Sequence, residues 1–162
     1  MLHLIPPSLH RAALRVAHRL RLLWWRLRRP VLQGCRVLAF DSEARVLLVR
    51  HGYGSSKWML PGGGISRRET PSTAATRELA EETGCRLYDA QVLAVVEEPL
   101  SGAINRVHLI TGRIEGSARP DGREIIELAW FAGDALPDNL SPALAGRIGE
   151  WIVLANAVRG SA

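Results

Sequence analysis

Apolar residues near the N-terminus recur at three- and four-residue spacing over residues 8–29, which predicts one amphipathic helix. The apolar positions of this helix are Leu9, Ala13, Val16, Leu20, Leu23, Trp24 and Leu27. Basic side chains occupy much of the remaining surface, namely Arg11, Arg15, His18, Arg19, Arg26 and Arg29. Ser8 is a suitable N-cap and Pro30 a suitable stop, so the segment is predicted to be a basic amphipathic helix.

From residue 31 onwards, shorter apolar runs of strand length replace this pattern. They predict strands at Val31–Phe40, Ala44–Arg50, Leu87–Glu98, Arg106–Glu115 and Leu128–Phe131. A hairpin through Asp41 to Glu43 joins the first two, and residues 51–69 are rich in loop-forming residues. Two helices are expected at Pro71–Thr83, between an N-cap at Thr70 and a C-terminal cap at Gly84, and at Pro142–Val158. This order indicates a mixed α/β or α+β domain.

Composition and length are those of one folded domain. The chain has 162 residues, of which 47% are hydrophobic and 23% are charged, and its mean hydropathy is +0.01. Such a chain is not mainly disordered. We therefore expect a basic helix within residues 1–30 and a single domain over residues 31–162.

Charge is distributed unevenly. Residues 1–40 carry eight arginines and no acid, a net charge of +8, whereas residues 41–162 carry 13 basic and 16 acidic residues, a net charge of −3. This distribution disfavours a uniformly basic nucleic-acid binder. Arginine interrupts every apolar stretch before residue 30, so neither a membrane span nor a secretory signal is expected. Cys35 and Cys85 form no CxxC pair, which fits a reducing compartment without a zinc site, and we expect a cytoplasmic location.

Three glutamates carry the clearest chemical signal. Glu78, Glu81 and Glu82 stand at i, i+3 and i+4 of the predicted helix, within about a 100° arc of one face. Like charges at this spacing destabilise a helix unless a cation lies between them. Carboxylate oxygens suit Mg²⁺ or Mn²⁺. The preceding residues 62–64 are three glycines, whose carbonyls suit a metal and whose N–H groups suit a phosphate.

The whole stretch from Gly63 to Cys85 resembles the Nudix box. That signature is Gly, five residues, Glu, seven residues, then Arg-Glu-apolar-any-Glu-Glu-any-Gly-apolar. Here Gly63 is followed by Glu69 and then by the run RELAEETGC from Arg77 to Cys85, so every charged and glycine position matches. Two departures are Cys85 at the final apolar position and Arg68 where the family often has glycine. The resemblance covers about residues 33–150.

The resemblance implies a fold, a reaction and roles for named residues. It implies an α/β/α sandwich around a mixed β-sheet, and Mg²⁺- or Mn²⁺-dependent hydrolysis of a nucleoside diphosphate linked to another moiety. By position, Glu78, Glu81 and Glu82 match the metal-binding glutamates, Gly62 matches a position whose carbonyl often joins them, and Arg77 matches an arginine that orients a carboxylate. The general base is left open between a box glutamate and Glu124, with Glu127, Glu97 and Glu98 as alternatives.

Candidate substrate contacts are Arg50, His51, Lys57, Gly63 and Gly64. The substrate itself stays open among ADP-ribose-like compounds, nucleoside triphosphates and dinucleoside polyphosphates. The rival class of function is a non-catalytic Nudix-like module that binds a nucleotide or RNA. Three roles are open for the basic helix. Packing against the body or in a homodimer comes first, contact with an anionic membrane surface second, and contact with nucleic acid third.

Overall fold

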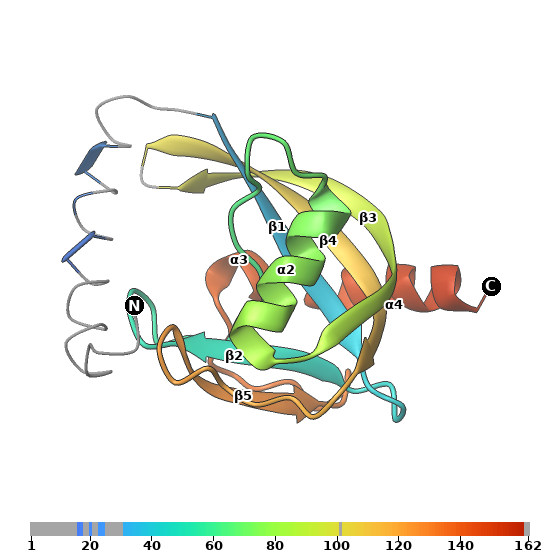
Figure 1. The fold of residues 1–162 in the computed structure, drawn as a ribbon. Helices are drawn as coiled ribbons and strands as arrows, with labels where there is room; N and C mark the ends of the chain where they lie inside the picture. The colour runs from blue at the N-terminus through green and yellow to red at the C-terminus, as the bar shows by residue number, and fades with distance from the viewer. Residues whose placement is uncertain (1–15, 18–19, 21–22, 25–30, 101, 161–162) are drawn as a thin grey trace.

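The computed structural model describes residues 16–17, 20, 23–24, 31–100 and 102–160 (Figure 1). Most of the basic helix predicted at residues 8–29 lies outside this part. Its described residues, Val16, Ala17, Leu20, Leu23 and Trp24, are all helical. Within the described residues, no helix is both long enough and apolar enough to cross a membrane.

A five-stranded mixed sheet forms the centre of the molecule (Figure 1). Its strands are β1 (Val31–Phe40), β2 (Val46–His51), β3 (Arg86–Leu100), β4 (Ala103–Glu115) and β5 (Ile125–Phe131), in the spatial order β3-β4-β1-β2-β5. The central pair β1 and β4 is parallel, and the β1–β2, β2–β5 and β3–β4 pairs are antiparallel. The hairpin predicted between the first two strands is therefore confirmed.

Alternation along β1 divides the buried side chains into two cores, one on each face of the sheet. Cys35, Val37 and Ala39 pack with α2 (Pro71–Thr83) through Ala74, Ala75 and Leu79. Leu38 and Phe40 pack on the opposite face with α3 (Pro142–Ala145) and α4 (Ile148–Arg159), through Leu144, Ile148, Trp151 and Ala155. Helices thus cover both faces of the sheet (Figure 1), which confirms the predicted mixed α/β fold. Both cysteines are buried and unpaired, so they form no disulfide.

The helix α2 has the predicted bounds and caps. The Thr70 hydroxyl accepts a hydrogen bond from the Thr73 N–H at 3.2 Å, and Gly84 ends the helix with a φ of 73°. This left-handed conformation favours glycine, which explains why the helix ends there.

The expectation of a single last helix at Pro142–Val158 was wrong. The chain instead forms α3 and α4, separated by Gly146 and Arg147. Glycine is a poor helix former, and the Arg147 backbone leaves helical geometry with a φ of −133°. Strand β2 is shorter than predicted, since it begins at Val46 and ends at His51. Three other strands are longer than predicted: β3 reaches Leu100, β4 begins at Ala103 and β5 begins at Ile125. Cross-strand pairing extends them past the apolar runs.

Candidate active site

A cleft of about 830 Å³ lies beside the amphipathic helix α2 and the glycine-rich loop that precedes it. It brings together eight of the residues proposed from the sequence, namely His51, Gly62, Gly63, Gly64, Glu78, Glu81, Glu82 and Glu124. These residues come from the end of β2, the glycine-rich loop, α2 and the residue that precedes β5. Folding therefore gathers carboxylates and loop backbone into one cavity.

Backbone hydrogen bonds fix the glycine-rich loop along the edge of β1. The Val37 N–H donates to the Pro61 carbonyl at 2.8 Å, and the Cys35 N–H donates to the Gly63 carbonyl at 2.9 Å. The Ile65 N–H in turn donates to the Gln33 carbonyl at 3.0 Å. The loop is therefore held like an additional short strand, and its backbone position is defined by β1.

The three glycines meet different surroundings. Gly62 has a φ of 145°, and a Cβ there would lie 2.2 Å from the Cys35 carbonyl oxygen, so a side chain is excluded. A Cβ at Gly63 would lie 2.5 Å from the Glu78 carboxylate, whereas a Cβ at Gly64 would meet nothing within 4 Å. Gly62 thus serves the packing of the loop, and Gly63 leaves room for the Glu78 side chain.

The helix glutamates differ strongly in exposure. The side chain of Glu82 is 7% exposed, that of Glu78 is 17% exposed and that of Glu81 is 61% exposed. Burial raises the pKa of both Glu82 and Glu78, because it disfavours the charged carboxylate. A cation placed in the cleft would offset this cost.

Arg77 connects the helix to the loop. Its guanidinium donates two hydrogen bonds to Glu69, both at 2.9 Å, and one to the Glu78 Oε1 at 2.9 Å. It also donates to the Gly64 carbonyl at 3.1 Å. The hydrogen bonds from Arg77 lower the pKa of Glu69 to about 2. Arg77 does not line the cleft, so its position is that of a residue that orients Glu78 from behind.

Glu124 and His51 approach the buried Glu82. The negative charge of Glu124 contributes to the raised pKa of Glu82, and the His51 Nε2 lies 3.3 Å from the Glu82 Oε1. The other Glu82 oxygen accepts from the Gly62 N–H at 3.0 Å. Tyr53 holds Glu124 in place, since its hydroxyl donates to the Glu124 Oε2 at 2.9 Å. The His51 Nδ1 is buried and has no hydrogen-bond partner among the described residues.

The chemistry of these residues fits a hard divalent cation. Four carboxylates line the cleft, two of them on side chains whose burial disfavours an uncompensated charge. The absence of a Cβ at residue 63 leaves room beside one of them. In the described part of the chain, no three Asp, Glu, His or Cys side chains converge into an ion site that is already formed. Glu78, Glu81 and Glu82 are the residues that would hold the ion, and Glu124 lines the same cleft as a candidate further ligand or base.

The other predicted residues lie outside the cleft. Arg50 pairs with Glu127 at 2.7 Å and stacks over the Trp58 ring, and Lys57 does not line the cavity. The alternative bases do not line the cleft either: Glu97 pairs with Arg106, and Glu98 pairs with Arg36, both at 2.7 Å. Glu124 is therefore the candidate outside the box that the structure brings to the helix glutamates.

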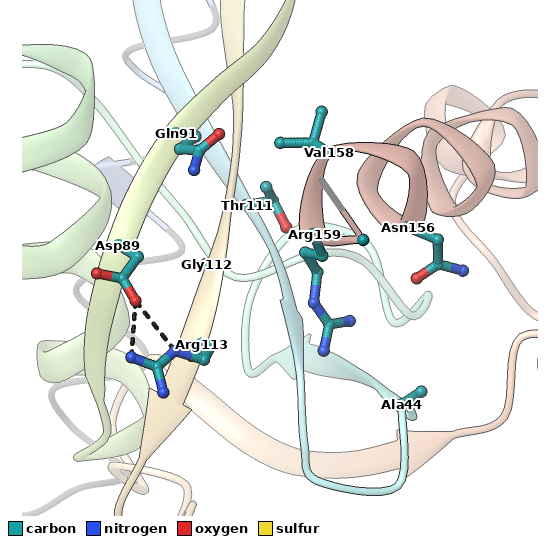
Figure 2. A pocket seen from close by; sticks show the side chains of 10 residues that line it. Ala44, Asp89, Gln91, Thr111, Gly112, Arg113, Asn156, Val158 and Arg159 are labelled. Carbon is teal, nitrogen blue, oxygen red and sulfur yellow. Dashed lines mark hydrogen bonds and ion pairs between the residues drawn. The ribbon is translucent and has the colours of Figure 1, made fainter. Parts of the chain in front are cut away.

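A second, smaller hollow of about 380 Å³ lies near the end of α4 (Figure 2). Its described lining contains one carboxylate, Asp89, which is ion-paired with Arg113 at 2.7 Å. It also lacks the glycine-rich loop. The cleft beside α2 is therefore the candidate active site.

Comparison with protein families agrees with this geometry. The family model described as the NUDIX domain matches residues 32–152. The chain belongs to the NUDIX family. The match spans the sheet, α2, the glycine-rich loop and Glu124, and it begins after the basic segment.

Relatives of this NUDIX protein are enzymes by name. A Bacillus subtilis protein named "Putative 8-oxo-dGTP diphosphatase" is 31% identical over 120 residues, which are 74% of this chain and 78% of that protein. A Mycobacterium tuberculosis protein named "Putative 8-oxo-dGTP diphosphatase 2" is 33% identical over 139 residues, which are 82% of this chain and 88% of that protein. The crystal structure of a MutT NUDIX hydrolase from Burkholderia pseudomallei has a TM-score of 0.67 at 29% identity, over 76% of this chain and 98% of that one. The chain is accordingly a hydrolase of the Nudix pyrophosphohydrolase family.

Several residues of the NUDIX cleft were missed by the sequence analysis. Tyr53 lines it, and so do Arg36 of β1 and Asn105 of β4. Arg36 interrupts the otherwise apolar run Cys35–Phe40, and a polar residue inside such a run was the available signal, whereas Asn105 is followed directly by polar Arg106 and carried none. Tyr53 carried no such signal, because its bond to Glu124 joins positions 71 residues apart.

Proposed function

We propose that this NUDIX protein is a metal-dependent hydrolase of a pyrophosphate linkage in a nucleotide. The observation that carries the proposal is the cleft in which Glu78, Glu81, Glu82 and Glu124 face a backbone loop of three glycines. Pyrophosphate is strongly anionic, so a cavity lined by carboxylates can accept it when cations separate the two.

The residues of the cleft have different roles in the proposed reaction. A Mg²⁺ or Mn²⁺ ion bound in the cleft would supply positive charge that stabilises the leaving phosphate and favours deprotonation of an attacking water. Glu78, Glu81 and Glu82 would hold that ion, and Arg77 keeps Glu78 in position. Water attacks one phosphorus, the bridging phosphorus–oxygen bond breaks, and the departing phosphate keeps the bond's electrons.

Glu124 is our candidate for the general base. Its Oε2 is held by the Tyr53 hydroxyl, so Oε1 is the atom assigned to take the proton from water. A carboxylate performs this step near neutral pH once a cation assists the deprotonation. The box glutamates are the alternative bases, and a substitution at Glu124 distinguishes the two assignments.

The substrate class we propose first is a nucleoside triphosphate. Two relatives at 31% and 33% identity are named as 8-oxo-dGTP diphosphatases. The cleft volume of about 830 Å³ is in the range of cavities that hold ligands of this size. Beyond the carboxylates, the cleft is lined by apolar Leu32, Leu100 and Val107 together with the Asn105 amide, which suits a flat base with polar edges.

A substrate panel tests the proposal. Product release is measured from dGTP, 8-oxo-dGTP, ADP-ribose, a dinucleoside polyphosphate and a nucleotide sugar, with Mg²⁺ or with a chelator. We expect metal-dependent turnover of at least one compound and a loss of orders of magnitude in Glu82→Gln. Glu150→Gln is the matched control, since Glu150 is an exposed helix glutamate outside the cleft.

Two results would contradict this function. Unchanged turnover in Glu82→Gln would show that this carboxylate takes no part in the reaction, and unchanged turnover with a chelator would show that no metal does. Nucleotide binding without turnover across the whole panel would favour the rival non-catalytic nucleotide-binding module. A cytoplasmic location remains part of the proposal, and fractionation of the source cells tests it.

A further inference from the structure

The N-terminal segment exposes a stripe of large apolar side chains. Among its described helical residues, Val16 is 58% exposed, Leu20 63%, Leu23 56% and Trp24 53%. At 100° per residue these four positions fall within about a 100° arc of one helix face. We name them the apolar stripe. A contiguous row of exposed apolar side chains indicates a surface that another partner covers.

The described NUDIX domain does not cover this stripe. The two cores of the sheet contain none of its four residues. Packing against the body was one explanation offered for the helix, and it would bury these side chains. Each of these residues is more than half exposed, so the partner lies outside the described part of the chain.

The charge of the segment selects the chemistry of that partner. Residues 8–29 carry seven arginines and no acidic residue. Two copies that met through this segment would bring fourteen arginines together without a carboxylate among them, which opposes a dimer. Nucleic acid would satisfy the arginines and leave the apolar stripe in water. A surface that is both anionic and apolar satisfies both features.

We propose that residues 8–29 bind the surface of an anionic lipid membrane and thereby hold the NUDIX domain against it. The apolar stripe enters the boundary between headgroups and acyl chains, and the arginines contact anionic headgroups. The adjacent Trp24 and Trp25 suit this boundary, where tryptophan is enriched. The proposal concerns location and is independent of the hydrolytic function.

Vesicle co-sedimentation of the full chain tests the proposal. The vesicles contain phosphatidylcholine alone or phosphatidylcholine mixed with phosphatidylglycerol. We expect the full chain to pellet with the anionic vesicles, to stay in solution with the neutral ones, and to be released by added salt. In the double variant Leu20→Asp/Leu23→Asp, partitioning falls at least about tenfold, because two apolar side chains no longer enter the lipid.

The matched control carries the same two substitutions elsewhere. Val153 and Leu154 of α4 are 70% and 40% exposed, and Val153→Asp/Leu154→Asp changes the net charge equally. This control should pellet like the unmodified chain. Thermal unfolding of both variants confirms that they are folded.

Four outcomes would overturn the proposal. The first is that the full chain stays in solution with anionic vesicles, and the second is that the stripe variant pellets as well as the control. The stripe variant changes the protein from dimer to monomer by ultracentrifugation while vesicles bind neither form, which would assign the stripe to a second copy. The full chain binds a labelled oligonucleotide and no vesicle, which would assign the arginines to nucleic acid.

Discussion

Replacing Gly63 by alanine should disturb the Glu78 carboxylate in the cleft while leaving the fold intact. The added Cβ would lie 2.5 Å from the Glu78 Cδ and Oε1, whereas ordinary contacts begin at 3.4 Å. The Glu78 carboxylate must therefore move by about 0.9 Å. This movement strains its 2.9 Å hydrogen bond with Arg77. The carboxylate ends a flexible side chain, so it can give way without moving the backbone.

The effect of Gly63→Ala on stability is expected to be much smaller than its effect on turnover and metal binding. We expect Gly63→Ala to lower the free energy of unfolding by less than about 1 kcal/mol, or about 2–4 °C in Tm for a protein of this length. A displacement of this size at a reacting centre lowers turnover by about 100-fold. A disturbed ligand environment weakens metal binding by about 10- to 100-fold.

Electron paramagnetic resonance of free Mn²⁺ measures this metal affinity without a substrate. Gly64→Ala is the matched control, since a Cβ at the adjacent glycine meets nothing within 4 Å. It should keep both the Mn²⁺ affinity and the Tm of the unmodified chain. Equal Mn²⁺ affinity in Gly63→Ala and the unmodified chain would refute the role of Glu78 as a metal ligand.

Four further predictions follow from the same geometry. Tyr53→Phe removes the hydrogen bond to Glu124 and should lower kcat by about tenfold without changing Tm by more than about 3 °C, and a larger loss of Tm with unchanged kcat would contradict a positioning role. Burial raises the pKa of Glu82 in the folded protein, so its charged form lowers the stability of the fold at neutral pH. Metal-free Glu82→Gln at neutral pH should therefore have a Tm, measured by calorimetry, no lower than that of the unmodified chain. The lowered pKa of Glu69, about 2, means that its contribution to stability is present above pH 4.5 and lost as the pH falls towards 2, so acid unfolding of Glu69→Gln should be less steep in that window. Saturating Mg²⁺ or Mn²⁺ should raise the Tm of the unmodified chain and have much less effect on Glu82→Gln, because an ion that binds the folded state at about 100 times its Kd adds about 2.7 kcal/mol.

The local features of the fold were predictable from the sequence. Thr70, Pro71 and Gly84 fixed the bounds of α2, because capping and the left-handed helix end depend on single residue types. The first strand was correct to the residue for a similar reason, since Pro30 precedes it and the hairpin at Asp41 follows it. The break between α3 and α4 was missed because the apolar spacing continues across Gly146.

The site was predictable as far as its residues lie within one continuous motif. Glu78, Glu81 and Glu82 share a helix face, so spacing alone brings them together. The link from Tyr53 to Glu124 depends on the fold, because it joins a loop after β2 to the residue before β5. Lys57 in a loop and Arg50 at the end of a strand were proposed as substrate contacts, and the fold directs neither of them into the cleft.

Calorimetric titration of the folded, metal-free chain with Mn²⁺ tests the central claim most directly. We predict saturable binding at neutral pH that is weakened at least about tenfold when Glu78 and Glu82 are both replaced by glutamine. The absence of Mn²⁺ and Mg²⁺ binding to correctly folded protein, with and without nucleotide, would contradict it.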